Sequence, residues 1–524
     1  MKSVLAIAGI LTLASCSSSE DFFTENLGDN NKSVKMTFTA SQENGSATRT
    51  AIGTEGGKTK IHWSESDVIK VTNGTETKDF TLTAGQGTTK ATFEGNMPVS
   101  EGYYAIYPNQ NGVSFSGNKF SGVELKAEQE AVEGSFDSKA AIMVAKSNGT
   151  NLPFKNVVAY FKVTPTFDCS EIVVTAHKST DALAGKFDVA IGDDGTPSIS
   201  NITNKSREVR LTGTITANKD YYILLLPGTF EYGFSVTLKP KDDTTKKYFK
   251  QKNSSFTLNR NDLWNLGKME GATEVSESKI PYITFTADKE QKFKYYNNYT
   301  QAHEGANEYL EYSVNGGEWK KFAGVVSLSA VSFGGGNGNL RLRAKVGQGN
   351  YVASADAGPM FKFGNETVEV NCTGDIRTLI DYENYYCANT SNAKFMNFFN
   401  SMTNLKSAPD LPSMELASQC YYAMFKGCTG LTTAPELPAT KLNPAYHCYR
   451  DMFNGCSKLS KVTMLATDYY ASYCLNNWLD NAGTSAQSRT LKLASKKVYD
   501  GMKKEGYLPE QWQSGQAAIE YNNQ

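Results

Sequence analysis

The chain has 524 residues, with 53 Lys and Arg against 54 Asp and Glu, and its formal net charge is −1 at pH 7. This balance gives no basic field for nucleic acid and no polybasic segment for an anionic lipid surface. Aromatic residues make up 11% of the chain, and 44 residues are Gly. Such a mixture favours short β-strands joined by turns. We therefore expect a mainly β, exported protein, whose length allows roughly three or four domains.

The N-terminus has the pattern of a lipoprotein signal. Lys2 precedes the apolar run Val4–Leu13, which is too short to span a bilayer and is typical of a secretory signal. The run ends in Leu13-Ala14-Ser15-Cys16, which resembles the lipobox of bacterial lipoproteins, where the Cys is linked to diacylglycerol. Ser17–Asp21 resembles the acidic surface-export signal of Bacteroidetes-type lipoproteins. The resemblance implies outer-membrane anchoring through acyl chains on Cys16, and the alternative is an ordinary signal peptide with an incidental Cys16.

Two sets of strands are predicted after the signal. In residues 34–40, apolar and polar side chains alternate, which is typical of a half-buried strand. A second set begins at Phe154–Val163 and continues through 171–176 and 221–226 to 234–238. Turn signals are closely spaced and no long amphipathic helix appears, so a pair of β-sandwiches is the simplest interpretation.

Four segments of this region resemble the fimbrillin family: Thr50–Gly53, Ile61–Val71, Tyr104–Pro108 and Phe154–Val163. The family comprises lipoprotein pilins and related adhesins of the Mfa-like type. The resemblance covers about residues 34–268 and implies two transthyretin-like β-domains in tandem.

The same resemblance draws attention to Arg49. In pilins of this family a trypsin-like protease cuts after an Arg that follows the first strand, and the open groove then accepts a strand from another subunit by β-augmentation. Here residues 34–40 would be the strand released by cleavage at Arg49. The alternative is that Arg49 is a solvated residue and the lipidated strand is retained. Because Gln513–Gln524 is mostly polar, it is no obvious donor strand, which favours a tip or accessory position in any pilus.

A third module follows the charged segment Met269–Lys279, which is typical of an interdomain linker. Strands are predicted at 281–286, 309–314 and 318–322. The last two flank Asn315-Gly316-Gly317, a hairpin turn because Asn and Gly tolerate positive φ.

The C-terminal part contains an internal repeat. Cys420–Leu431 is echoed 28 residues later by Cys448–Leu459, and Leu405–Pro412 is echoed 26 later by Leu431–Pro438. This period lies in the range of leucine-rich repeats, whose units must stack to bury their apolar faces. We expect a short helix in each unit, because Cys420, Met424 and Cys428 recur at i, i+4 and i+8, and a strand at 431–437.

The doubled block resembles the BspA-like leucine-rich repeats of surface lipoproteins, over about residues 280–495. Proteins of that family are implicated in attachment to host matrix, epithelium or other bacteria, and no activity is assigned to the repeat. The resemblance implies ligand binding at exposed strand positions of the solenoid. The candidates are Lys406, Asp410, Thr432 and Glu436.

The remaining cysteines and the histidines give no catalytic constellation. Five of the eight Cys after Cys16 recur at repeat positions, and three interpretations stay open. They are a buried ladder of thiols, disulfides, which are permitted outside the cytoplasm, and a metal site, which is least favoured because no Cys-x-x-Cys exists and His447 lacks a His partner. The four His are scattered and no Gly-x-Ser-x-Gly occurs, so we expect no enzyme, no metal and no cofactor beyond the lipid on Cys16.

Together these observations predict a cell-surface lipoprotein adhesin, with a fimbrial tip or accessory role open. Its predicted partners are the outer membrane, other pilus subunits through strand exchange, and host or bacterial surface proteins or glycans. The alternative is a glycan-binding lipoprotein for nutrient capture, with Tyr421, Tyr422, Tyr446 and Tyr449 as an aromatic platform. The predicted divisions are a signal peptide (1–15), a tether (16–33), two fimbrillin-like β-domains (34–150 and 151–268), a linker (269–279), a β-module (280–372), leucine-rich repeats with a cap (373–495) and a C-terminal tail (496–524).

Overall fold

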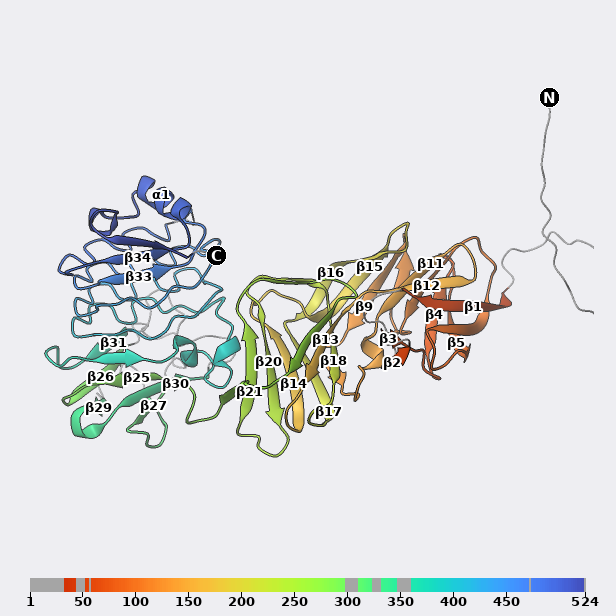
Figure 1. The fold of residues 1–524 in the computed structure, drawn as a ribbon, viewed down its shortest axis with the longest axis horizontal. Coiled ribbons are helices and arrows are strands. Elements are labelled where there is room, and N and C mark those ends of the chain that lie inside the picture. Colours follow the sequence, from red (N-terminus) through yellow and green to blue (C-terminus); the bar gives the residue numbers. More distant parts are fainter. Residues whose placement is uncertain are drawn as a thin grey trace, which may run out of the picture.

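The computed structural model describes residues 33–43, 52–55, 58–296, 310–322, 331–345, 360–470 and 473–522. The described chain is elongated, with the N-terminal strands at one end and the C-terminal module at the other (Figure 1). It is mainly β, which confirms the predicted class. Among the described residues, α1 (Lys496–Lys504) is the only α-helix.

The first unit is a closed barrel in which β1 lies between β6 and β12. The predicted alternation of β1 is correct at its centre, where Phe38 and Ala40 are buried and Thr37 and Thr39 are exposed. Phe38 packs edge-on against Phe80 inside the barrel, with ring centroids 5.0 Å apart. In barrel order the strands are β1 (Val34–Gln42), β12 (Asn151–Asn156), β11 (Met143–Ser147), β7 (Tyr103–Tyr107), β4 (Val68–Thr72), β5 (Thr77–Ala84) and β6 (Lys90–Met97).

The second unit has a large and a small sheet, and a further sheet connects it to the barrel. In the large sheet the strand order is β10 (Glu128–Glu130), β17 (Glu208–Ile215), β14 (Cys169–Ala176), β20 (Phe234–Pro240), β21 (Lys247–Lys252) and β24 (Thr273–Val275). In the small sheet the order is β18 (Tyr221–Leu225), β13 (Ala159–Thr164) and β23 (Leu263–Lys268). In the connecting sheet it is β16 (Pro197–Ser206), β15 (Ala184–Ile191), β9 (Lys119–Leu125) and β8 (Ser114–Ser116). Two antiparallel two-stranded sheets complete this half. One pairs β2 (Ile52–Glu55) with β3 (Lys58–Ile61), and the other pairs β19 (Gly228–Phe230) with β22 (Phe256–Leu258).

Strand pairing crosses two of the predicted divisions. The chain position 150/151 does not separate the sheets, because β12 completes the barrel while β10, earlier in the chain, pairs with β17. The predicted strand 154–163 is accordingly two strands, β12 and β13, with Val157 and Val158 between them. The predicted linker 269–279 contains β24, which extends the large sheet and buries Val275. Alternation alone cannot show these exchanges, since it reports which face is buried and not which strand is the neighbour.

The third unit begins with two small sheets. In the first the strand order is β28 (Lys320–Lys321), β27 (Leu310–Val314), β30 (Leu340–Ala344), β25 (Ile283–Thr286) and β32 (Asn371–Thr373). In the second it is β29 (Val331–Phe333), β26 (Gln291–Tyr296) and β31 (Met360–Phe363). The predicted hairpin turn is present, with positive φ at Asn315 and Gly316. These sheets share one apolar core with most of the chain that follows, and this core extends from Ile283 to Trp512.

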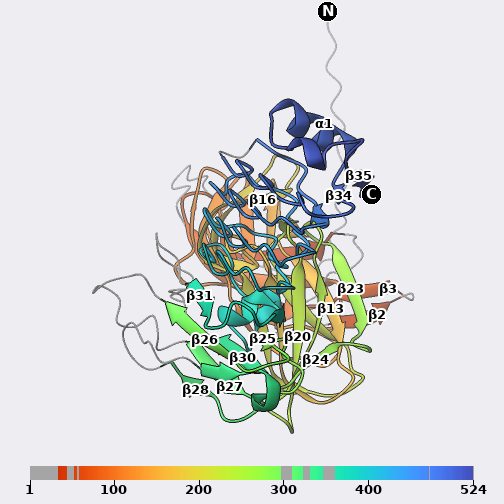
Figure 2. The same ribbon diagram turned by 90° about the vertical axis from the view of Figure 1, so that its left-hand side faces the viewer.

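The repeats form coils stacked on these sheets (Figures 1 and 2). Successive coils are joined by backbone hydrogen bonds, such as Phe399 N–H to the Met424 carbonyl and Phe425 N–H to the Met452 carbonyl. Parallel bridges at Thr433–Lys461 and Leu437–Met464 join the other side of the coils. Here the predicted strand 431–437 is reduced to these bridges, and a regular strand appears one coil later as β33 (Lys461–Met464).

The predicted short helix in each repeat is wrong. Every fourth residue of this segment has positive φ, at Gln419, Ala423 and Gly427. Met424 N–H donates to the Tyr421 carbonyl within the coil, whereas Phe425 N–H donates to the next coil. An α-helix keeps all its backbone bonds within one segment, so the segment is a series of turns. The i, i+4, i+8 spacing that indicated a helix is shared by this four-residue turn period.

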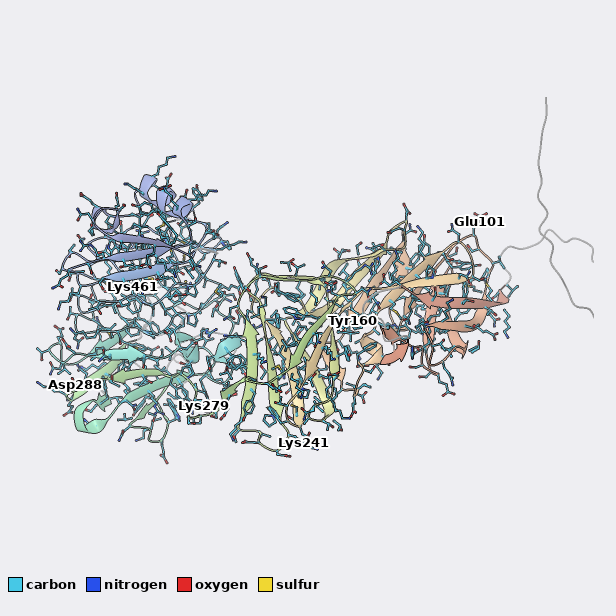
Figure 3. All side chains as sticks on the ribbon, in the orientation of Figure 1. Glu101, Tyr160, Lys241, Lys279, Asp288 and Lys461 are labelled. Carbon is cyan, nitrogen blue, oxygen red and sulfur yellow. The ribbon has the colours of Figure 1, made fainter. Side chains whose placement is uncertain are left out.

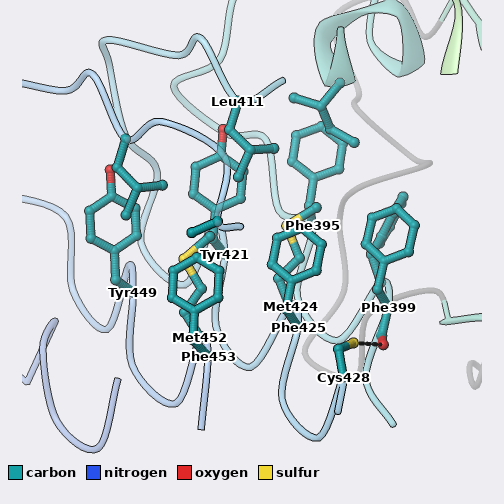
Figure 4. Close-up of a cluster of buried hydrophobic side chains, with 14 of the residues drawn as sticks. Phe395, Phe399, Leu411, Tyr421, Met424, Phe425, Cys428, Tyr449, Met452 and Phe453 are labelled. Atoms are coloured by element: carbon teal, nitrogen blue, oxygen red, sulfur yellow. Dashed lines mark hydrogen bonds between the residues drawn. The ribbon is translucent and has the colours of Figure 1, made fainter. Parts of the chain in front are cut away.

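The core of the stack consists of side chains repeated from coil to coil (Figure 4). Phe399, Phe425 and Phe453 are fully buried, and their rings stack at 5.2 and 5.7 Å with planes 4° apart. A second column contains Phe395, Tyr421 and Tyr449, with centroids 6.0 and 6.1 Å apart.

The predicted tail 496–524 is folded over residues 496–522. The strands β33, β34 (Thr490–Leu493) and β35 (Ala518–Tyr521) pair in parallel. Helix α1 begins after Ser495, whose hydroxyl accepts from Val498 N–H, and Trp512 is completely buried. These residues therefore close the stack. Their polar composition alone did not distinguish a cap from a tail, because a capping segment also presents a polar outer face.

A side-chain contact joins the second unit to the first repeats of the third unit. Phe249 of β21 stacks on Tyr386 with centroids 3.9 Å apart and planes at 6°, and the Tyr386 hydroxyl lies 3.0 Å from that of Thr237. Beside them, Ser179 donates to Glu415 from both its N–H and its hydroxyl, at 2.9 and 3.0 Å. Lys279, labelled in Figure 3, marks where the chain passes between the two units.

Candidate functional site

The four predicted ligand-binding residues lie on the strand side of the stack, which Lys461 marks in Figure 3. Lys406 and Thr432 occupy equivalent positions of neighbouring coils, as do Asp410 and Glu436. Thr432, Asp410 and Glu436 are exposed. These four residues are called the strand-side columns below.

Two of these residues have local partners. The Lys406 ammonium pairs with Glu369 at 2.5 Å, and Lys406 N–H donates to the Val370 carbonyl at 2.8 Å. Partial burial, with a contribution from the neighbouring carboxylate of Asp375, raises the pKa of Asp410. Thr432 and Glu436 therefore present the more accessible polar groups of the columns.

A second exposed feature lies about half a coil away along the chain. It contains Tyr422, Tyr446, His447 and Tyr473, called the aromatic patch below. The Tyr446 and His447 rings are 3.9 Å apart, and Tyr473 lies 6.0 Å from Tyr446 and 5.4 Å from His447. Tyr446 is 43% exposed and Tyr473 54%. Of the described residues, the only other exposed large aromatic side chain is Tyr470, near the patch in sequence.

Arg450 lies at the edge of the aromatic patch. Its guanidinium carbon lies 5.9 Å from the centre of the Tyr422 ring, and one of its terminal nitrogens lies 3.4 Å from His447 Nε2. Partial burial, together with the Arg450 charge, lowers the pKa of His447. The patch thus combines exposed rings with a cation and a neutral imidazole.

The patch changes the predicted tyrosine platform. Tyr421 and Tyr449 are only 2% and 1% exposed, because they belong to the buried aromatic column, and they cannot contact a ligand. Tyr422 and Tyr446 remain at the surface, joined by Tyr473, which sequence reasoning did not single out. The sequence did contain a signal for Tyr473. It directly precedes the repeat cysteine Cys474, as His447 directly precedes Cys448.

All eight described cysteines are buried and free. The Cys428 thiol donates to the Phe399 carbonyl at 2.9 Å and the Cys456 thiol to the Phe425 carbonyl at 3.0 Å, which fits the thiol-ladder interpretation at these positions. Within the described ranges, no three His, Cys, Asp or Glu side chains gather into a group suited to a metal ion.

Two surface clefts lie between units. One, of about 720 Å³, lies between the barrel and the second unit and is lined by Glu124, Glu128, Asp137 and Lys139 among others. The other, of about 620 Å³, lies beside the contact of the second and third units, with Arg207, Lys345 and Asp381 in its lining. Both are mostly charged and polar, so neither resembles the apolar pocket usual for a small organic ligand.

Cys16 and Arg49 lie outside the described residues. What the structure describes is the strand before Arg49: β1 pairs with β6 from Val34 to Ser41 and with β12 from Thr39 to Gln42. No helix among the described residues is long and apolar enough to cross a membrane.

No protein-family model matches the chain, and no curated protein matches it significantly. Among solved structures, a candidate cell adhesion protein from Bacteroides ovatus is 11% identical with a TM-score of 0.30, covering 46% of this chain and 96% of its own. One from Bacteroides uniformis is 15% identical with a TM-score of 0.28, covering 47% and 95%. A fimbrial protein from Bacteroides ovatus is 12% identical with a TM-score of 0.23, covering 46% and 50%. TM-scores this low do not establish a shared fold.

Proposed function

We propose that the chain is a cell-surface lipoprotein adhesin, anchored in the outer membrane through lipid on Cys16, and that its stack of BspA-like leucine-rich repeats binds surface ligands. The observation that supports this most directly is the arrangement in Figure 1. The N-terminal barrel and the C-terminal stack occupy opposite ends of an elongated molecule. A lipid at the N-terminus would therefore hold the strand-side columns and the aromatic patch away from the membrane, where a host or bacterial surface can reach them.

The test compares attachment of producing cells to surfaces coated with extracellular matrix. A strain lacking the gene is complemented with the wild type, with T432A/E436A, or with T214A/E130A, which removes the same groups from exposed positions of the second unit. Adhesion through the columns predicts loss with the first pair and none with the second. Equal attachment of all strains, including the one lacking the gene, would exclude the adhesin function under these conditions.

A fimbrial role is part of the same proposal and rests on β1. In the barrel, both edges of this strand are hydrogen-bonded, so its release by cleavage at Arg49 would expose a groove between β6 and β12. Main-chain hydrogen bonds with an incoming strand would then restore the barrel. A chain starting at Thr50 is expected to bind a peptide of residues 33–43, because the peptide returns the missing strand to the groove, whereas a scrambled peptide of the same composition is expected not to bind. A folded Thr50 chain that does not bind the peptide would refute strand exchange.

The aromatic patch favours a second candidate function, glycan binding for nutrient capture. Exposed tyrosine rings offer apolar faces to a sugar ring, and Arg450 and His447 add polar groups beside them. A glycan array probed with the full chain tests this, with Y446A/Y473A as the variant. Y470A is the control, since it removes an exposed tyrosine outside the patch. Binding that survives in Y446A/Y473A would place the glycan site elsewhere.

A further inference from the structure

Two cysteines of neighbouring coils meet sulfur to sulfur. Cys448 Sγ lies 2.9 Å from Cys474 Sγ, and Cys448 N–H points at the same sulfur at 3.2 Å. Both side chains are completely buried. The two residues are 26 positions apart and occupy equivalent positions in the repeat. The stacking of neighbouring coils therefore brings their sulfurs together.

The other repeat cysteines provide an internal comparison. Cys428 and Cys456 are equally buried and also lie in neighbouring coils, but each thiol donates to a backbone carbonyl. Cys474 likewise donates to the Ala445 carbonyl, at 2.7 Å, but the Cys448 thiol has the sulfur of Cys474 as its partner. A hydrogen bond from Cys448 lowers the pKa of Cys474, which favours the thiolate that thiol–disulfide exchange requires.

We infer that Cys448 and Cys474 form a disulfide that covalently joins two coils of the stack. The bond needs the sulfurs only ~0.9 Å closer than they lie, since a disulfide measures about 2.05 Å. The oxidant is a disulfide, from a dithiol oxidoreductase or a small molecule. One thiolate attacks it and releases one thiol, and the second cysteine displaces the other. The two cysteines thus lose two protons and two electrons, and the oxidant becomes two thiols.

The bond would act directly beside the aromatic patch. His447 precedes Cys448 and Tyr473 precedes Cys474, so the cross-link fixes the two coils that carry most of the exposed rings. Holding these rings in place before a ligand arrives reduces the ordering cost of binding. In the cell the inference rests on the proposed surface location, because disulfides persist in oxidising compartments and not in the cytosol.

The test maps the cysteines of the full mature chain. The purified protein is equilibrated with oxidised and reduced glutathione, denatured, alkylated and digested with trypsin. We expect six of the eight described thiols to be alkylated, and peptides 442–450 and 462–489 to be recovered as one linked species. Alkylation of all eight thiols under oxidising conditions, or a link between Cys428 and Cys456, would overturn the inference.

Two variants and one further sample make the result specific. C448S should show seven alkylated thiols and no link, whereas C428S should keep the link and show five. Protein taken from the cell envelope with its thiols trapped at harvest is mapped in the same way. A link formed in glutathione but absent from the envelope sample would support the cysteine pair and count against the proposed surface location.

Discussion

Replacing Phe425 by Ala tests whether the stacked rings hold the coils together. Phe425 is fully buried, with Phe399 5.2 Å away on one side and Phe453 5.7 Å away on the other. Phe-to-Ala changes in a core cost about 3–5 kcal/mol, and each aromatic pair contributes about 0.5–1.5 kcal/mol beyond its buried area. Phe453 is equally buried but stacks on a ring of this column on one side only. F425A should therefore destabilise the C-terminal unit by about 1 kcal/mol more than F453A.

Differential scanning calorimetry of the full chain is the assay, because the barrel and second unit share a core separate from that of the third unit. A loss of about 4 kcal/mol lowers the melting temperature of a unit this size by roughly 8–16 °C. The transition of the first two units should stay in place and serves as the internal control. F425L keeps most of the volume but loses both ring contacts, so it should cost roughly 1–3 kcal/mol. If F425A cost no more than F453A, ring stacking between coils would not be what stabilises the column.

Three further predictions concern the contact of the second and third units, where His177, Tyr386 and Glu415 line one small pocket. Asp181 lies close enough to Glu415 to interact with it electrostatically. Burial lowers the pKa of His177 to about 4, below its unfolded value of about 6.5, so the unfolded chain takes up the proton first. The free energy of unfolding of the wild type should therefore fall by up to about 3 kcal/mol between about pH 6.5 and pH 4, and that of H177Q should fall less. The melting temperature measured against pH tests this. Burial raises the pKa of Asp181 to about 6, so D181N should stabilise the fold at pH 7 and bring no gain below about pH 4, on the same assay. Y386A removes the Phe249 stack and the Thr237 hydrogen bond, so the calorimetric transition of the third unit should move to lower temperature. An unchanged transition would show that this contact does not stabilise the third unit.

Much of the chain follows from local sequence. The alternation at residues 34–40 identifies β1, and Asn315-Gly316 identifies a turn, because only a few residue types accept the backbone angles found there. The 26 and 28-residue offsets place Phe399, Phe425 and Phe453 in one column, since equivalent residues of stacked units must meet. The lipid on Cys16 and cleavage at Arg49 remain predictions.

The tertiary structure decided what one segment's pattern leaves open. Cys420, Met424 and Cys428 fit a helix or a run of turns equally well in sequence, and only hydrogen bonds to the next coil distinguish them. The same holds for exposure: Tyr446 and Tyr449 are three residues apart, yet one lies at the surface and the other in the core. Sequence determined the period and the composition of each unit because these are properties of the chain itself. The bond partners, the exposed rings and the meeting of Cys448 with Cys474 depended on how neighbouring coils lie against each other.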